Sequence, residues 1–276
     1  MTSKESICLT AAFVLLAAGA SAQPAVNLRL TNIPTSWYGA HQLDRHAMNA
    51  TEAQHESKVR FLDAALHVIR AKGYSATRVE DVCEAARLTK GSFFHHFDSK
   101  EDLALAAAAH FAAMADALFA TASYQSATDP LERLLGYVEF RIAILQGSLP
   151  EFTCLLGTMV QETYDTHPAI RTACNTHISA HAAQVATIIA EAKRRYAPDA
   201  TWTAESLALH IQAVIQGAFV LAKARRGPRV AAECLQHLRR YLETQFTQTP
   251  TKEHEPWPAS RRSRRSSGST ATPRRR

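Results

Sequence analysis

The sequence predicts an all-α protein, and three observations support this fold class. Only 10 glycines and 11 prolines interrupt 276 residues, of which 46% are hydrophobic, so long helices around a sizeable core are expected. Between residues 58 and 246 apolar side chains recur at steps of three and four, which is the period of an amphipathic helix. The sustained apolar alternation that is typical of strands does not occur in that range.

The first 47 residues differ from the helical region. An apolar run from Ile7 to Ala18 is followed by Ala20-Ser21-Ala22, the small-residue pattern of a secretory cleavage site. The run is too short to span a bilayer as a helix, so a permanent anchor is the weaker interpretation. We expect residues 1–47 to be a signal-like or over-extended leader outside the fold, with the working protein beginning near Met48.

The C-terminal residues 247–276 carry the net charge of the chain. They hold eight Lys/Arg and two Glu, which accounts for the whole formal charge of +6. Their Ser, Arg and Pro content predicts a disordered basic tail that cannot bury a core, although it would attract polyanions without reading sequence. The net charge therefore does not indicate that the folded part binds nucleic acid.

The first two helices follow from periodicity and capping signals. Residues 58–72 place their apolar side chains on one stripe, and Gly73 is expected to end this helix. Thr77 and Glu80 have the spacing of a capping box, which predicts a short second helix that ends at about Ala86.

A tight turn and two further helix starts complete an N-terminal domain at residues 55–104. Residues 87–89 form the turn, and Thr89 is expected to cap a third helix at residues 90–97. A long fourth helix begins after the capping residue Ser99. Two short helices joined by three residues are the helix-turn-helix arrangement, in which the second helix enters the major groove of DNA.

The segment TKGSFFHHFDSK, from Thr89 to Lys100, has three interpretations: a metal site, an aromatic core segment or a nucleic-acid reader. Two adjacent histidines on a helix point about 100° apart, which disfavours a metal site at His95 and His96. Phe93 and Phe97 lie four apart and are expected in the core. The other side chains have donors and one aromatic ring suited to phosphates and base edges: Thr89, Lys90, Ser92, Phe94, His95 and His96.

The stretch GYSATRVEDVCEAARLTKGSFFHHFDSKEDL, residues 73–103, resembles the DNA-binding signature of the TetR/AcrR transcriptional regulators. The resemblance implies a homodimer with a three-helix DNA-binding head and a larger helical body that binds a small molecule. It places three residues near base edges: Lys90, Gly91 and Phe94. It places four near phosphates: Thr89, Ser92, His95 and Lys100. Arg78 is a further phosphate candidate.

Some of these assignments have independent support, and two positions depart from the family. A missing side chain at Gly91 allows close backbone approach to DNA, and Lys100 lies in the first turn of a helix, where anions are favoured. Phe94 replaces a common tyrosine, so a phenolic donor is lost. Arg87 replaces a glycine of a left-handed turn, so either the turn is reshaped or Arg87 reaches a phosphate.

Residues 105–246 are expected to form the helical effector-binding and dimerisation domain. Proline or capping signals predict helix starts near residues 130, 150, 168 and 204, for about nine helices in all. The last two helices, at about 203–224 and 230–246, are expected to form a dimeric four-helix interface through these apolar positions: Leu207, Ile211, Val214, Ile215, Ala218, Val220, Leu221, Cys234, Leu235, Leu238, Tyr241 and Leu242.

The effector is not evident from the sequence, because the candidate residues are also those that a helical core needs. The candidates are Tyr137, Phe140, Cys154, Met159 and His177. FTCLLGTMVQE, residues 152–162, resembles a stretch of electrophile-responsive repressors of the N-ethylmaleimide type, which makes Cys154 a candidate sensing thiol. His177 and His181, four apart, form an alternative metal pair without an evident third ligand.

These observations predict a homodimeric DNA-binding repressor, released from a palindromic operator by a small apolar or electrophilic effector. No catalytic constellation, cofactor motif or metal site is evident in the sequence, so we expect no enzyme. Five widely spaced cysteines without a C-x-x-C pair fit a reduced compartment, the cytoplasm. Two alternatives remain: a secreted helical protein cleaved after Ala22, and an enzyme that recruits His177, His181 and Cys154.

Overall fold

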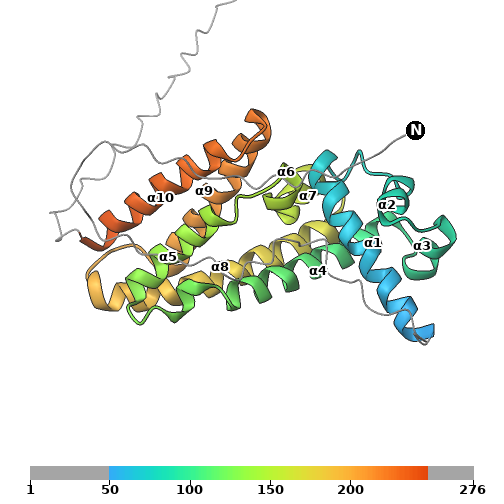
Figure 1. Cartoon of the computed structure of the whole chain (residues 1–276). Coiled ribbons are helices and arrows are strands. Elements are labelled where there is room, and N and C mark those ends of the chain that lie inside the picture. Colours follow the sequence, from blue (N-terminus) through green and yellow to red (C-terminus); the bar gives the residue numbers. More distant parts are fainter. Residues whose placement is uncertain (1–49, 248–276) are drawn as a thin grey trace, which may run out of the picture. The chain divides into compact units, whose positions relative to one another are not determined.

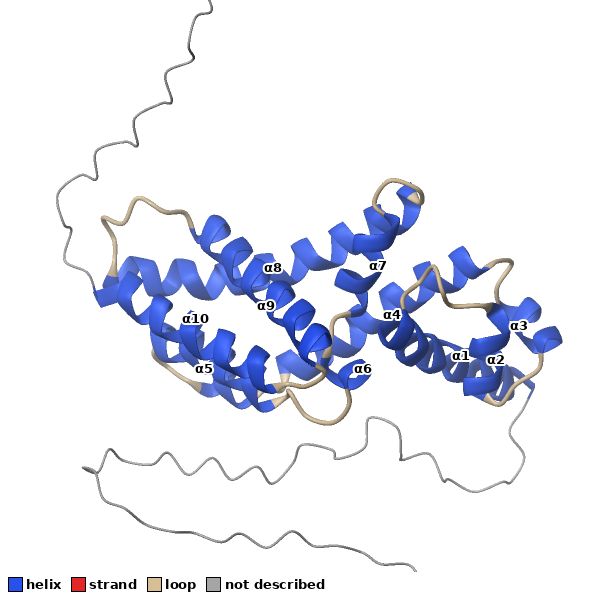
Figure 2. Cartoon of the chain, turned by 90° about the horizontal axis from the view of Figure 1, so that it is seen from above, coloured by secondary structure: helices blue, strands red, loops and turns tan. Residues whose placement is uncertain are grey.

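The computed structural model describes residues 50–247, with side chains from 54 to 246. In this part of the chain helices are joined by loops and turns and no strand occurs (Figure 2), which confirms the predicted all-α class. It has ten α-helices and one 3-10 turn, η1: α1 Ala50–Lys72, α2 Val79–Ala86, α3 Lys90–His96, α4 Lys100–Ala120, η1 Ser123–Ser126, α5 Pro130–Ala143, α6 Leu149–Phe152, α7 Leu155–Thr163, α8 Pro168–Tyr196, α9 Ala204–Arg225 and α10 Arg229–Thr247. The predicted leader and nearly all of the basic tail lie outside the described residues.

Most predicted helix starts are found at the residues that carry the signals. Thr89, Ser99, Asp129 and Thr203 each accept a backbone amide of the first turn of their helix, which satisfies donors that a helix leaves unpaired. The prediction of about nine helices was one short. The additional helix is α7, which begins at Leu155 after the N-cap residue Cys154, and cysteine is not a common cap.

The predicted capping box of the second helix was wrong by one residue. Thr77 is buried, and its hydroxyl donates to the carbonyl of Gly73 at 2.6 Å. Arg78 is the residue before α2, and its amide donates to the carboxylate of Asp81 at 2.7 Å. Thr77 is used to close the preceding turn, where Gly73 has a φ of +89°, so the cap moves to the next residue.

The helix-turn-helix end of the molecule, α1 to α3, is built on aromatic packing. The ring of Phe61 on α1 meets Phe93 at 5.6 Å and Phe97 at 6.2 Å, in edge-to-face geometry. All three side chains are at most 2% exposed. α1 begins eight residues earlier than predicted, and Gln54 and Ser57 in the extra turns bond to histidines of α3.

The body consists of α5, α8, α9 and α10, together with the second half of α4. α4 and α8 lie side by side in Figure 1, and α9 packs against both α8 and α10. By length and composition alone, α4 and α9 could cross a membrane. Leu207, Ile211 and Ile215 of α9 are instead buried in the body core, as expected for a core helix.

Head and body share one hydrophobic cluster. Leu155, Leu156 and Met159 of α7, with Ile170 and Cys174 of α8, pack in the same cluster as the aromatic residues of the head. The buried guanidinium of Arg70 on α1 donates to the carbonyls of Glu151 and Thr153 at 3.4 and 3.3 Å. One hydrophobic cluster therefore includes residues on both sides of the predicted boundary between residues 104 and 105.

Candidate nucleic-acid interface

The seven residues of α3 separate into a buried and an exposed face. Phe93 has no exposed surface, whereas Phe94 is 51% exposed. Gly91 is exposed as well, and a Cβ built on it would find only the hydroxyl oxygen of Thr89 within 4 Å, at 3.8 Å. The exposed face of α3 therefore offers a ring and an open stretch of backbone beside Lys90.

Lys90 is held at the start of α3 by an exposed ion pair. Its ammonium lies 2.6 Å from the carboxylate of Glu80, and both side chains are more than half exposed. The bond to Glu80 raises the pKa of Lys90, and the same bond lowers the pKa of Glu80. Because exposed ion pairs are worth little, a phosphate or base edge can displace Glu80 at small cost.

The turn between α2 and α3 keeps the left-handed conformation that the family resemblance implies. Arg87 has φ 53° and ψ 44°, and its amide donates to the carbonyl of Glu84 at 3.0 Å. The guanidinium of Arg60 on α1 donates to the carbonyl of Ala86 at 2.6 Å, which ties the end of α2 to α1. The turn is thus not reshaped around Arg87, and a phosphate contact by its side chain stays a prediction.

Arg78 and Lys100 differ in how much of their charge faces solvent. The side chain of Arg78 is 73% exposed and pairs with Asp81, whose pKa is held well below its usual range by Arg78 and Lys72. Lys100 donates to the carbonyls of Tyr74 and Thr77, at 3.2 and 3.1 Å, and sits over the ring of Tyr74. Lys100 therefore braces the α1–α2 loop, and a phosphate would compete with these carbonyls.

The two adjacent histidines fasten α3 to α1. His95 bonds to Gln54 at 2.9 Å, and His96 bonds to the hydroxyl of Ser57 at 2.7 Å. Burial lowers the pKa of His96, so this ring is mainly neutral at pH 7. Within residues 50–247 no three His, Cys, Asp or Glu side chains converge as metal ligands would.

Two of the five predicted effector residues meet at one aromatic ring. Tyr137 and Phe140 of α5 both contact the ring of Phe119, at centroid distances of 5.8 and 5.5 Å. Met159 is fully buried in the cluster between head and body. Cys154 lies at the start of α7, where its sulfur accepts the amide of Gly157, and His177 is half-buried on α8.

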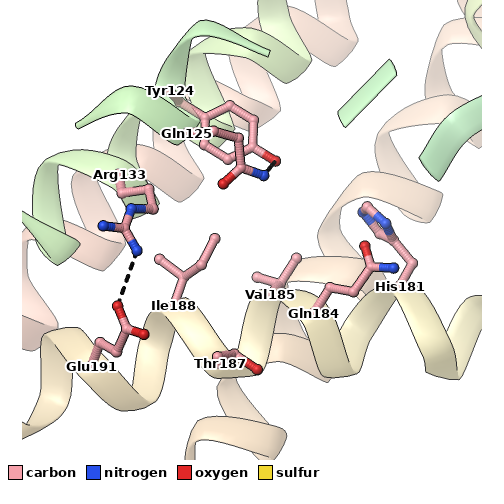
Figure 3. A pocket seen from close by; sticks show the side chains of 9 residues that line it. All are labelled: Tyr124, Gln125, Arg133, His181, Gln184, Val185, Thr187, Ile188 and Glu191. Atoms are coloured by element: carbon pink, nitrogen blue, oxygen red, sulfur yellow. Dashed lines mark hydrogen bonds and ion pairs between the residues drawn. The ribbon is translucent and has the colours of Figure 1, made fainter. Parts of the chain in front are cut away.

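A pocket of about 320 Å³ opens beside this aromatic group (Figure 3). α8 forms one wall, with the apolar side chains of Val185 and Ile188, and Tyr124 faces them across the pocket. His181 lies at one end and the ion pair of Arg133 and Glu191, 3.0 Å apart, at the other. Sequence reasoning did not identify this pocket, because its walls come from η1, α5 and α8 and share no local motif.

Only some of the twelve residues of the predicted dimer interface are exposed in the described chain. Seven of its twelve positions are buried in the body core: Leu207, Ile211, Ile215, Ala218, Leu235, Leu238 and Leu242. Val220, Leu221 and Tyr241 are exposed, by 46%, 44% and 41%, and Leu209 is 56% exposed on the same helix as the first two. Fewer apolar residues of α9 and α10 therefore face outward than the predicted interface contains.

Comparisons with known proteins match both parts of the chain. The profile described as bacterial regulatory proteins, tetR family, matches residues 61–107, and that of the tetracyclin repressor-like C-terminal domain matches 130–238. The transcriptional regulator AcuR of Cereibacter sphaeroides is 33% identical over 112 residues, which are 39% of this chain and 48% of that protein. The repressor DhaR of Mycobacterium sp. is 28% identical over 111 residues, 40% of this chain and 54% of its own. The matched region spans about half the length of these relatives.

Solved structures agree with the fold over a longer stretch. A regulatory protein TetR from Rhodobacter sphaeroides, 25% identical, has a TM-score of 0.61 and covers 70% of this chain and 99% of its own. A TetR-family regulator from Cytophaga hutchinsonii, 23% identical, has a TM-score of 0.62 and covers 74% and 100%. E. coli NemR in its reduced form, 21% identical, has a TM-score of 0.57 and covers 67% and 96%.

Proposed function

The chain belongs to the TetR family of bacterial regulatory proteins, and on that premise we propose that it is a cytoplasmic homodimeric repressor. It binds a palindromic operator through α3 and leaves it when a small-molecule effector occupies the body. The observation that carries the proposal is the division of α3, whose buried face holds Phe93 and whose exposed face presents Lys90, Gly91 and Phe94.

The exposed face of α3 is suited to the major groove. The ammonium of Lys90 can exchange Glu80 for a guanine edge or a phosphate, and both partners are exposed enough to be reached. The ring of Phe94 can pack against a thymine methyl group. The open backbone at Gly91 allows the helix to approach without a side chain between it and the bases.

Phosphate contacts around this face position α3. Thr89, Ser92 and His95 lie on α3 or its cap, and Arg78 lies at the start of α2. Lys100 stands in the first turn of α4, where helix amides favour an anion, but its ammonium has two carbonyl partners already. We therefore expect Arg78 to contribute more to phosphate binding than Lys100.

Dimerisation is assigned to the outer surface of α9 and α10. Leu209, Val220, Leu221 and Tyr241 are large apolar side chains exposed on these two helices. The two helices pack against each other, so these side chains can serve one interface, and a twofold contact uses the same surface twice. The two helices from each subunit would then form a four-helix arrangement.

Coupling between effector and DNA runs through α8. Ile170 and Cys174 near its start pack in the cluster that includes the head, and Val185 and Ile188 further along line the pocket. A ligand that moves α8 changes the packing beneath the head. Cys154 offers a second entry point, since it touches both hydrophobic clusters at the start of α7, and modification of its sulfur by an electrophile would disturb the same joint.

The test is a titration of the full chain against DNA from upstream of its own gene, at several salt concentrations. The double variant Lys90→Ala, Phe94→Ala is expected to lose specific binding. Arg229→Ala is the control with the same loss of charge, because Arg229 is 94% exposed at the start of α10, in the body. A chain that ends at Phe246 measures what the basic tail adds. Specific binding lost only on truncation would assign DNA binding to the tail and contradict the proposal.

A further inference from the structure

Tyr137, Arg141 and His181 meet in a polar network at the end of the pocket. Tyr137 and Arg141 of α5 face His181 of α8, and each places a polar atom 3.0 Å from its Nε2. Nε of Arg141 also donates to the hydroxyl oxygen of Tyr137 at 3.0 Å. The guanidinium lies over the ring of Phe119, 4.4 Å from its centroid, so it is fixed between an aromatic face and the network.

The hydrogen atoms of this network can be assigned by counting donors. A guanidinium only donates, so the nitrogen of His181 that faces Arg141 must accept. The hydroxyl of Tyr137 accepts from Arg141 and, at 3.5 Å, from the buried amide of Gln212, so its own hydrogen also points to Nε2, whose single lone pair the two donors share. Burial and the charge of Arg141 lower the pKa of His181 to about 3, in agreement with a neutral ring. The proton of the neutral imidazole is therefore on Nδ1.

Nδ1 of His181, on a ring that is partly buried, keeps solvent-accessible surface. It has no hydrogen-bond partner among residues 54–246, and no buried side-chain nitrogen or oxygen in that range is left unpaired. Nδ1 is therefore accessible, and the accessible space beside His181 is the pocket (Figure 3). The pocket thus has a donor of fixed direction at one end.

The other walls define what a ligand must look like. Val185 and Ile188 form an apolar wall opposite the ring of Tyr124. At the far end Arg133 is held by Glu191 and by two bonds to the carbonyl of Ala127. In the described chain Arg141 forms no ion pair within 4 Å, and its positive charge acts on the ring of His181, whose pKa it helps to lower.

We propose that the pocket takes small organic molecules with an apolar body and one oxygen acceptor, a carbonyl or carboxylate, which accepts the Nδ1–H of His181. Arg141 and Tyr137 act as positioning residues, since they fix the tautomer without touching the ligand. The charge of Arg141 favours a polarised or anionic oxygen and disfavours organic cations. This inference rests on the proposed function, because it names the effector class of the same body.

Ligand binding to the free full-length protein tests the proposal, with four probes of similar size: acetophenone, benzoate, ethylbenzene and benzylamine. Titration calorimetry should show binding of the two oxygen probes and weaker or no binding of ethylbenzene and benzylamine. His181→Phe should weaken the oxygen probes about tenfold, the value of one hydrogen bond. His181→Asn places an amide nitrogen where Nδ1 lies and should restore part of the affinity.

Thr172→Val is the matched control, because Thr172 is exposed on the same helix, does not line the pocket, and its hydroxyl donates to the carbonyl of Pro168. This change should leave all four affinities as they are. The proposal would be overturned if ethylbenzene or benzylamine bound as tightly as acetophenone and benzoate. It would also be overturned if His181→Phe left the affinity for the oxygen probes unchanged, or if neither oxygen probe bound.

A measurement on the unmodified protein keeps the inference testable if a variant fails to fold. Long-range nitrogen-15 NMR distinguishes the protonated from the unprotonated ring nitrogen of a histidine. We expect the proton of His181 on Nδ1, and a proton on Nε2 would contradict the assignment. None of these measurements includes DNA, so an operator that fails to bind would contradict the proposed repressor and leave the ligand result intact.

Discussion

The head and the body use charged side chains in opposite ways. In the head, Lys90 is exposed and has a single partner, Glu80, which is exposed too. In the body, Arg141 is partly buried, stacks on Phe119 and holds two further groups, Tyr137 and His181, at 3.0 Å. The ion pair of Lys90 and Glu80 can open toward a new partner. The side chains of Arg141, Tyr137 and His181 instead hold one another in place.

This difference follows from the cost of leaving a polar group unpaired. An exposed ion pair contributes about 0–1 kcal/mol, since water replaces either partner when it leaves. A buried polar network leaves unpaired donors when one member is removed, at about 1–3 kcal/mol each. The head surface is therefore suited to exchange its contacts on DNA, and the body network is suited to hold one hydrogen-bond direction for a ligand.

The largest expected effect separates the two faces of α3. Phe93→Ala should lower the free energy of unfolding by about 3–5 kcal/mol, because it removes a fully buried ring that contacts Phe61. Phe94→Ala, one residue later, should change it by less than about 0.5 kcal/mol and instead weaken operator binding. Urea unfolding and operator titration of both variants measure this. A large loss of stability in Phe94→Ala would place that ring in the core and remove it from the reading face.

The second expected effect concerns pH and the network in the body. In the unfolded chain His181 takes up a proton near pH 6.5, but in the folded protein only near pH 3. Between these values the unfolded state binds more protons, so the contribution of His181 to stability is present above pH 6.5 and is lost as the pH falls. From pH 6.5 to 4.5 the loss amounts to roughly 2 kcal/mol.

Unfolding curves from pH 7 to 4.5 test this, with His181→Asn as the comparison. The variant should show a flatter dependence, because Asn does not titrate. The pKa values of carboxyl groups such as Glu80 and Asp129 are lowered in the folded protein, so their contribution to the free energy of unfolding is lost mainly at lower pH. Ending the series at pH 4.5 limits their effect on the curves. Parallel curves for the unmodified protein and His181→Asn would show that His181 titrates alike in the folded and the unfolded state.

Local signals predicted the head well and the body less well, for a physical reason. The caps at Thr89 and Ser99 depend on residues three positions away, so a sequence window contains both partners. The cap at Thr77 was misplaced because a bond to Gly73, in the preceding turn, competes for its hydroxyl. The resemblance to the family, rather than periodicity, supplied the DNA-binding assignments.

The pocket and its network depend on contacts that no local window contains. Tyr137 and His181 are 44 positions apart, and Arg141 is 40 positions from the same histidine. In the sequence His181 appeared with His177 as a metal pair, four residues apart on one helix. The structure instead gives its Nε2 two donors from α5. Similarly, the spacing of the apolar residues identified α9 and α10 as helices. It did not separate the side chains that face the core from those that face outward.

The smallest expected effect uses two arginines with nearly the same backbone. Arg87 ends α2 with φ 53° and ψ 44°, and Arg226 ends α9 with φ 54° and ψ 39°. A left-handed conformation costs a residue with a Cβ about 1 kcal/mol, and glycine relieves this cost but gains freedom in the unfolded chain. Arg87→Gly and Arg226→Gly should therefore each change stability by a few tenths to about 1 kcal/mol, with the same sign.

DNA binding should separate this matched pair. Arg87 lies in the turn before α3, so if its guanidinium reaches a phosphate, Arg87→Gly lowers operator affinity and reduces the slope of affinity against salt by about one ion. Arg226→Gly removes the same charge from the body and should leave both quantities unchanged. Equal effects of the two variants on DNA would mean that only total charge matters. No effect of either would show that Arg87 closes the turn as Arg226 does, and that the head makes its phosphate contacts through other residues.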